Sequence, residues 1–243
     1  MEIRICENPV HLGEQAAKLT AEILRNAIAE KGEARIVLST GASQFDTIKS
    51  LVEQDVDWSK VEMFHLDEYV GLPITHGASF RKYLQERFVD KVAPLKAVHF
   101  VDGTKEGIPA LTKELRRAPI DVGLIGIGEN GHIAFNDPPA NLETKEAYII
   151  VDLDDACKKQ QMGEGWFPTI DDVPKQAVSM TVYQIMQCDR IITSCPHAVK
   201  ANAIYNTLAQ EPNNMVPGTI LKQHKEFHLF IERGSASKAI NIK

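Results

Sequence analysis

Residues 121–127 read Asp121-Val122-Gly123-Leu124-Ile125-Gly126-Ile127, and the chain continues as Gly128-Glu129-Asn130-Gly131-His132-Ile133-Ala134-Phe135-Asn136-Asp137-Pro138. The first run is short, apolar and punctuated by glycine, which is typical of a strand covered on both faces of its sheet. Open α/β sheets bind their ligands in loops at the carboxyl ends of such strands. We therefore expect residues 128–138 to form a functional loop.

Strand and helix patterns alternate on both sides of this segment. Leu12, Ala16, Leu19, Ile23 and Ala27 recur at spacings of three and four, which predicts an amphipathic helix ended by Gly32. Further strands are expected at 36–38, 61–66, 98–101, 122–127, 148–153, 190–194 and 227–231, with helices after Ser43, around Phe80 to Phe88 and Leu111 to Leu115, and over 197–210. This alternation predicts an α/β fold: a doubly wound, largely parallel sheet with helices on both faces, in one domain spanning 1–243.

Composition narrows the class of protein. The 243 residues are 44% hydrophobic and 25% charged, with a net charge of −6. The sequence contains no basic stripe that would attract nucleic acid or an anionic membrane surface. No apolar stretch approaches the length of a membrane span, and the amino terminus lacks the apolar region of a secretory signal. Four cysteines at spacings that fit neither a zinc site nor a redox pair indicate a reducing compartment. We expect a cytoplasmic protein.

The loop after residue 127 carries the strongest chemical signal. Histidine is the residue type that most readily exchanges protons near neutral pH, so His132 is a candidate acid–base group, and Asp137 lies five residues on, where it can orient the imidazole ring. A lone histidine is more often structural, but Asn130, His132 and Asp137 form a polar cluster that a purely structural loop has little reason to assemble. The sequence offers no second histidine or cysteine at ligand spacing, so we expect no metal.

Two further segments add candidate residues at the same edge of the sheet. Ser39-Thr40-Gly41-Ala42-Ser43 joins a strand to a helix, where hydroxyls and backbone N–H groups can hold a phosphate, although plain helix caps are the commoner use. Asp67 follows an apolar run and is either a second acid–base group or a loop carboxylate that caps the next turn. Lys200 follows another strand, where its ammonium can reach a phosphate.

Residues 154–175 are polar and contain Gly163, Gly165, Pro168 and Pro174. This composition is compatible with a mobile flap that covers the active site. The adjacent Trp166 and Phe167 either close over a ligand or pack the loop onto the core, and the sequence does not separate these alternatives.

Two motifs, 64–72 and 126–138, resemble the signatures of the glucosamine-6-phosphate deaminase (isomerase) family. The resemblance runs in order over most of the chain and includes Ser39 to Ser43, Val173-Pro174-Lys175 and Lys200. It implies ring opening of a sugar phosphate, proton transfer between C2 and C1, and hydrolytic release of ammonia without a cofactor, as part of amino-sugar metabolism, including N-acetylglucosamine catabolism. It makes Asp67 the base of the proton transfer and His132 the ring-opening catalyst, with Asn130 and Asp137 orienting the imidazole. Ser39, Thr40, Gly41, Ala42, Ser43 and Lys200 become the phosphate-binding residues.

The chain departs from the family pattern at three places. Asp137 stands where glutamate is more common, the phosphate turn continues as Gly41-Ala42-Ser43-Gln44 without its usual second glycine, and 158–167 lack the arginine that well-studied members place before the aromatic pair. These departures leave the preferred amino sugar open. Family members range from single subunits to hexamers, so a homo-oligomer and allosteric activation are left open as well.

Two other functions remain as alternatives. A 6-phosphogluconolactonase shares the superfamily and a similar glycine-histidine loop, but its pattern does not usually continue Phe-Asn-Asp/Glu-Pro after the histidine. A non-catalytic sugar-phosphate sensor would keep the phosphate site. Retention of Asp67, His132 and Asp137 disfavours the sensor, as does the lack of an amino-terminal helix-turn-helix.

Overall fold

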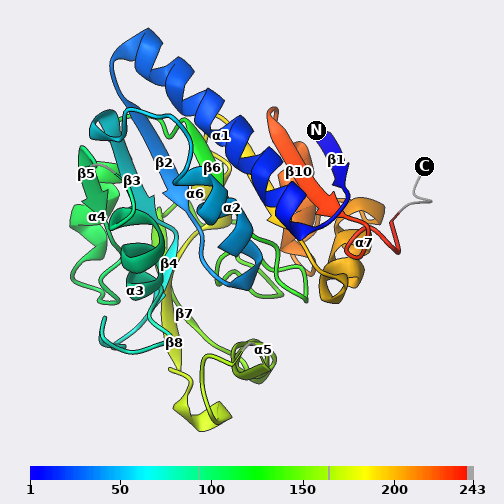
Figure 1. Ribbon diagram of the computed structural model, residues 1–243. Helices are drawn as coiled ribbons and strands as arrows, with labels where there is room; N and C mark the ends of the chain where they lie inside the picture. The colour runs from blue at the N-terminus through cyan, green and yellow to red at the C-terminus, as the bar shows by residue number, and fades with distance from the viewer. Residues whose placement is uncertain (93, 164, 240–243) are drawn as a thin grey trace.

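The computed structural model describes residues 1–92, 94–163 and 165–239. Its centre is a seven-stranded, fully parallel sheet with the strand order β1-β10-β9-β6-β2-β3-β5 (Figure 1). In this order the strands are β1 (Glu2–Cys6), β10 (Phe227–Glu232), β9 (Ile191–Cys195), β6 (Val122–Leu124), β2 (Ala34–Leu38), β3 (Val61–His65) and β5 (Ala97–His99). The prediction of a single doubly wound α/β domain is confirmed.

The chain runs outward from β2 through β3 to β5 and then crosses back to β6, which lies on the other side of β2. From β6 it continues outward to β9 and β10. The strand order therefore reverses between β2 and β6, and open α/β sheets bind ligands at such a switch point. Strand β1 was not predicted, because its five residues lie at the sheet edge and mix charged with half-exposed apolar side chains.

Helices cover both faces of the sheet because each buried strand carries apolar side chains on both faces. Along β2, Ile36 and Leu38 face one apolar cluster and Val37 faces the other. The first face is covered by α1 (Pro9–Lys31), α2 (Phe45–Leu51) and α3 (Phe80–Leu84), and the second by α4 (Ile108–Leu115), α6 (Val182–Ile185) and α7 (Ala201–Ala209). Short 3-10 turns span Ala42–Gln44, Trp58–Lys60, Ile170–Asp172, Ala198–Lys200 and Pro217–Gln223, and a π-helical turn, Gln85–Val89, continues α3.

The longest helix, α1, begins and ends where its sequence directs. The Asn8 side chain accepts a hydrogen bond from the His11 N–H at 2.9 Å, and Gly32 adopts the left-handed conformation that closes the last turn. This confirms the predicted end of the helix. Within the described residues, none of the helices combines the length and apolar character that a membrane crossing requires.

A second, three-stranded antiparallel sheet extends from the carboxyl edge of the main sheet. It consists of β4 (Asp67–Tyr69), β8 (Gln176–Met180) and β7 (Tyr148–Asp152), in the order β4-β8-β7. Asp67 and Ser179 are paired across β4 and β8. The sequence predicted a strand at 148–153 but not its antiparallel partners. The main sheet alone is therefore parallel.

The predicted flap, 154–175, contains α5 (Asp155–Gly163) and the 3-10 turn Ile170–Asp172. Figure 1 shows α5 beside β7 and β8, away from the main sheet. Cys157 and Phe167 are buried in a small apolar cluster that also contains Tyr69, Phe80 and Phe135. The mobility of this segment stays a prediction.

Candidate active site

A cavity of about 150 Å³ lies at the carboxyl edge of the sheet, where the strand order reverses. Much of its lining follows the strands of the main sheet: 39–43 after β2, Asp67 after β3, 126–129 and His132 after β6, and His197, Val199 and Lys200 after β9. Parallel strands bring their carboxyl ends to one edge, so residues far apart in sequence meet here. The cavity includes all the predicted site residues except Asn130 and Asp137, which lie against His132 instead.

The turn 39–43 presents hydroxyl groups to the cavity. Gly41 has φ of 93°, a conformation that favours glycine, and its carbonyl accepts a hydrogen bond from the Tyr83 hydroxyl at 3.1 Å. No side-chain oxygen caps the 3-10 turn Ala42–Gln44 or α2. The Ser39 hydroxyl is buried and, within the described residues, has no hydrogen-bond partner. The helix-cap interpretation is therefore wrong, and the hydroxyls remain available to a ligand.

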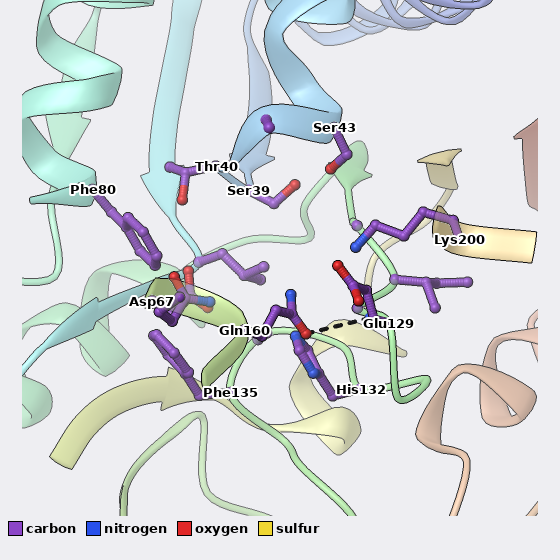
Figure 2. A pocket seen from close by; sticks show the side chains of 18 of the residues that line it. Ser39, Thr40, Ser43, Asp67, Phe80, Glu129, His132, Phe135, Gln160 and Lys200 are labelled. Atoms are coloured by element: carbon purple, nitrogen blue, oxygen red, sulfur yellow. Dashed lines mark hydrogen bonds between the residues drawn. The ribbon is translucent and has the colours of Figure 1, made fainter. Parts of the chain in front are cut away.

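Lys200 brings a positive charge to the same end of the cavity. The residue is only 8% exposed, and within the described part of the chain no hydrogen bond or ion pair engages its ammonium group. Figure 2 shows the Lys200 side chain extending toward Ser43 and Ser39. An ammonium that faces a cavity without a counter-ion favours a ligand that supplies the negative charge. An anion therefore fits this end of the cavity.

Asp67 enters the cavity from the other side of the view in Figure 2, between Phe80 and Phe135. The residue is 6% exposed. Burial, followed by the negative charges of Glu68 and Asp137, raises the pKa of Asp67 to about 8. A carboxyl with a pKa near neutrality is suited to taking up and returning protons.

The neighbouring carboxylate, Glu68, points to the opposite face of β4. Its oxygens accept hydrogen bonds from Ser79 Oγ at 2.8 Å, from the Phe80 N–H at 3.2 Å and from the Arg81 N–H at 2.9 Å. Glu68 therefore fixes the start of α3, the structural role considered for Asp67 in the sequence. Asp67 stays free to face the cavity.

His132 lines the cavity, and its ring is held in place by contacts to Nδ1. Its Nδ1 atom lies 2.6 Å from Asn130 Oδ1 and 3.1 Å from Asp137 Oδ1, and Asn130 Nδ2 donates to Asp137 Oδ1 at 2.9 Å. Both neighbours of Nδ1 are acceptors, which assigns the proton of the neutral ring to Nδ1 and leaves Nε2 as the basic nitrogen. Burial alone would raise the pKa of Asp137, but hydrogen bonds from His132 and Asn130 and the charge of His132 outweigh it and lower this pKa. Asp137, although one methylene shorter than the glutamate that is more common at this position, therefore keeps its contact with the imidazole.

The backbone around the cavity is strained at two positions. Ala134 has φ of 50° and His197 has φ of 75°, and both line the cavity. Residues other than glycine seldom adopt this left-handed region, and such residues cluster at functional sites. Gly128 packs directly on His132, since a Cβ atom there would lie 2.1 Å from the ring. The loop conformation is therefore tied to the position of the imidazole.

Sequence reasoning missed several lining residues, among them Phe80, Glu129, Phe135, Gln160, Gln161 and His197. Glu129 and Phe135 belong to the motif around His132, and His197 precedes Lys200 by three residues. Their closeness in sequence to predicted site residues could have identified them as candidates. Gln160 and Gln161 lie in the region where the family arginine is absent. The side of the cavity formed by Gln160 and Gln161 therefore carries neutral amides.

The aromatic pair of the predicted flap packs against the second sheet. Phe167 is buried, with its ring 5.4 Å from that of Tyr69 and 5.5 Å from that of His76. Trp166 is partly buried against the same cluster. Phe167 therefore anchors the segment to the protein, as the packing alternative predicted.

The fold and this cavity define a class: a doubly wound α/β protein with a carboxyl, an imidazole and an ammonium group around a cavity at the switch point of its sheet. The family model described as glucosamine-6-phosphate isomerases/6-phosphogluconolactonase matches residues 7–230. The chain belongs to this family, which confirms the resemblance found in the two motifs.

Individual relatives agree with this assignment. A glucosamine-6-phosphate deaminase from Shouchella clausii is 31% identical over 92% of this chain and 93% of its own length, and one from Lacticaseibacillus paracasei is 30% identical over 98% of each. A solved monomeric glucosamine-6-phosphate deaminase is 26% identical with a TM-score of 0.89, covering 98% of this chain and all (100%) of its own. A 6-phosphogluconolactonase from Thermotoga maritima shares the fold, with a TM-score of 0.76 at 17% identity over 95% of this chain and 99% of its own.

Proposed function

We propose that this protein is an aldose-ketose isomerase and deaminase that converts glucosamine 6-phosphate, or a close 2-amino sugar phosphate, to fructose 6-phosphate and ammonia. The observation that carries the proposal is that Asp67 and His132 line the same cavity as the Lys200 ammonium, which has no partner among the described residues. The names of the relatives support it, because the curated proteins matched over most of the chain are glucosamine-6-phosphate deaminases.

The phosphate binds between Lys200 and the 39–43 turn. The ammonium supplies the charge, while Ser39 Oγ and its neighbouring hydroxyls supply hydrogen bonds. Holding the phosphate at one end aligns the sugar carbons with the acid–base groups at the other end, so remote binding is converted into orientation.

His132 opens the sugar ring. Its basic Nε2 takes the proton of the C1 hydroxyl and returns a proton to the ring oxygen, which yields the open-chain aldehyde. Asn130 and Asp137 hold the Nδ1 proton, and Asp137 stabilises the imidazolium that forms during the transfer. These two residues act through His132 without touching the sugar.

Asp67 then moves a proton from C2 to C1. The ionised carboxylate removes the C2 proton and delivers it to C1 from the same face, while a proton of the amine passes to O1, so the aldehyde becomes an alcohol and the C2 amine becomes an imine. Water adds to the imine, ammonia leaves, and the ketone of fructose 6-phosphate remains. The carboxyl pKa of about 8 leaves Asp67 able both to accept and to release this proton.

The location, the pathway and the flap complete the proposal. Cys6, Cys157, Cys188 and Cys195 are buried and unpaired, which suits a reducing compartment such as the cytoplasm, where the enzyme would serve N-acetylglucosamine catabolism. Residues 154–175 act as the flap that covers the cavity, because Gln160 and Gln161 from α5 already line it.

The test is to incubate the purified protein with glucosamine 6-phosphate and to measure ammonia and fructose 6-phosphate. We expect both products in equal amounts, and a loss of at least about 10³-fold in Asp67→Asn, within the range of acid–base catalysis. Hydrolysis of 6-phosphogluconolactone without ammonia release would favour the lactonase alternative. Tight binding of the amino sugar phosphate without turnover would favour the sensor.

A further inference from the structure

Helix α5 presents three side chains to the site at helical spacing. Cys157, Gln160 and Gln161 lie three and four residues apart, so they share one face of the helix. The Cys157 thiol is buried and hydrogen-bonds with the Asp137 carboxylate, while Gln160 and Gln161 line the cavity. The Gln160 side-chain oxygen accepts a hydrogen bond from the Glu129 N–H at 3.4 Å, as the dashed line in Figure 2 marks.

Gln161 is held in one orientation by Tyr69. The Tyr69 hydroxyl donates to Gln161 Oε1 at 2.7 Å, and both residues are buried. Tyr69 and Asp67 are two residues apart on β4, so their side chains leave the strand on the same face. The Tyr69 ring is itself fixed among Phe80, Phe135 and Phe167 at centroid distances of 5.0–5.4 Å.

This hydrogen bond decides what the amide offers to a ligand. Because Oε1 accepts from Tyr69, the free group of Gln161 is its Nε2, a neutral donor. Within the described residues no acceptor is bonded to Nε2. A neutral donor is satisfied by a hydroxyl or carbonyl oxygen, whereas the phosphate already has the Lys200 ammonium.

We propose that Gln161 is a specificity-determining residue: its Nε2 donates a hydrogen bond to an oxygen of the sugar chain near the carbon on which Asp67 acts, and Tyr69 is the positioning residue that aims the amide. The inference rests on the proposed function, in that the ligand is a sugar phosphate. Loss of this hydrogen bond is expected to weaken sugar binding about tenfold, as for other buried hydrogen bonds, while the phosphate contacts are unchanged.

The experiment uses two ligands that separate the sugar from the phosphate. The first is the open-chain hexitol obtained by reducing C1 of glucosamine 6-phosphate, which cannot react, and the second is inorganic phosphate. Calorimetry measures both dissociation constants for the wild type, Gln161→Ala, Gln161→Glu, Tyr69→Phe and the double variant Tyr69→Phe/Gln161→Ala. Lys159→Ala, on the exposed face of α5, is the matched control.

We expect Gln161→Ala to weaken the hexitol phosphate about tenfold and inorganic phosphate less than about twofold. Gln161→Glu, which replaces the donor with an acceptor, should weaken the hexitol phosphate further. Tyr69→Phe should have a smaller effect and none in the Gln161→Ala background, because Tyr69 acts through that amide.

Three results would overturn the inference: hexitol affinity unchanged in Gln161→Ala, equal losses for both ligands, or no hexitol binding to the wild type. Turnover separates this inference from the proposed function. A wild type that binds the hexitol through Gln161 but releases no ammonia from the amino sugar phosphate refutes only the reaction. One that releases ammonia with no dependence of affinity on Gln161 refutes only this role.

Discussion

The Nδ1 atom of His132 lies 3.1 Å from Oδ1 of Asp137, and both residues come from the same loop after β6. His132 faces the cavity, whereas Asp137 does not line it. The carboxylate therefore contacts only the rear of the ring, where it fixes the tautomer and offsets the charge of a protonated imidazole. We therefore expect a change at Asp137 to alter kcat more than KM.

Asp137→Asn should lower kcat by about 10²-fold and leave KM within about threefold, because an amide cannot neutralise the imidazolium. Asp137→Glu restores the charge and should recover most of the lost kcat. Steady-state kinetics with glucosamine 6-phosphate measure both effects. An Asp137→Asn enzyme with wild-type kcat would show that ring opening does not depend on this contact.

Gly128→Ala should lower the activity of the enzyme without unfolding it. A Cβ atom at residue 128 would lie within 2.1–2.4 Å of three atoms of the His132 ring, so the imidazole must move out of its place in the cavity. We expect kcat to fall at least about tenfold, since a displacement of about 1 Å is enough for a loss of this order. Activity and circular dichroism measure the two parts of the prediction.

Gly77→Ala is the matched control, because a Cβ atom there meets no heavy atom within 4 Å and no unusual backbone angle is involved. It should keep wild-type activity. Equal activity in Gly128→Ala and Gly77→Ala would mean that the loop relaxes around the added methyl group and that the close packing on His132 is not required.

Local patterns were sufficient to predict most of the main sheet. Apolar runs such as residues 61–66 and 227–231 have the length and burial of parallel strands, and Gly32 ends α1 as its position indicated. Because ligands bind at the carboxyl edge of such sheets, the positions of Asp67, His132 and Lys200 after their strands were enough to predict that they share one cleft. These inferences succeed because they depend on short-range periodicity and on one general property of the fold.

The remaining features depend on contacts between distant segments. The antiparallel sheet requires β4 to pair with β8, and Asp67 is paired with Ser179, far along the chain, so no local pattern around Asp67 announces it. Gln161 reaches the cavity because Tyr69 binds it across 92 residues of sequence. The pKa of Asp67 likewise depends on burial, which is a property of the assembled fold.

The pH dependence should report the ionisation of Asp67. Its pKa of about 8 means that the carboxylate needed as a base forms only as the pH rises toward and past 8. The value of kcat/KM should therefore increase about tenfold for each pH unit below about 7 and level off above about 8. A profile that is flat between about pH 6 and pH 9 would exclude Asp67 as the base with this pKa.

Stability should show the opposite trend with pH. The pKa of Asp67 is 3.8 ordinarily and about 8 in the fold, so between these values the folded protein retains a proton that the unfolded chain has released. The corresponding stability is complete below about pH 4 and is lost as the pH rises through about 8. Asp67→Asn removes this loss and should be more stable at about pH 9 by a few kcal/mol, a rise in Tm of several degrees.

Thermal melts of the wild type and Asp67→Asn at about pH 5 and pH 9 measure this difference. The gap in Tm should be clearly smaller at the lower pH, because most of the loss of stability occurs as the pH rises from about 5 to about 8. A gap in Tm that is the same at both values would contradict the linkage and would point to a packing effect of the amide. Glu53→Gln, a change at an exposed carboxylate, is the control and should show no gap at either pH.

Lys200→Met tests the phosphate end of the cavity. Methionine keeps most of the length of the side chain but removes the ammonium, which faces the cavity and, among the described residues, has no counter-ion. We expect KM to rise about 10²-fold because a charge-assisted contact to the phosphate is lost, with a smaller decrease in kcat as the sugar becomes less well aligned. The ligand-free variant should be about as stable as the wild type, since the ammonium that is removed has no partner among the described residues. Inorganic phosphate should raise the Tm of the wild type and leave that of Lys200→Met unchanged; a similar rise in both would place the phosphate elsewhere on the protein.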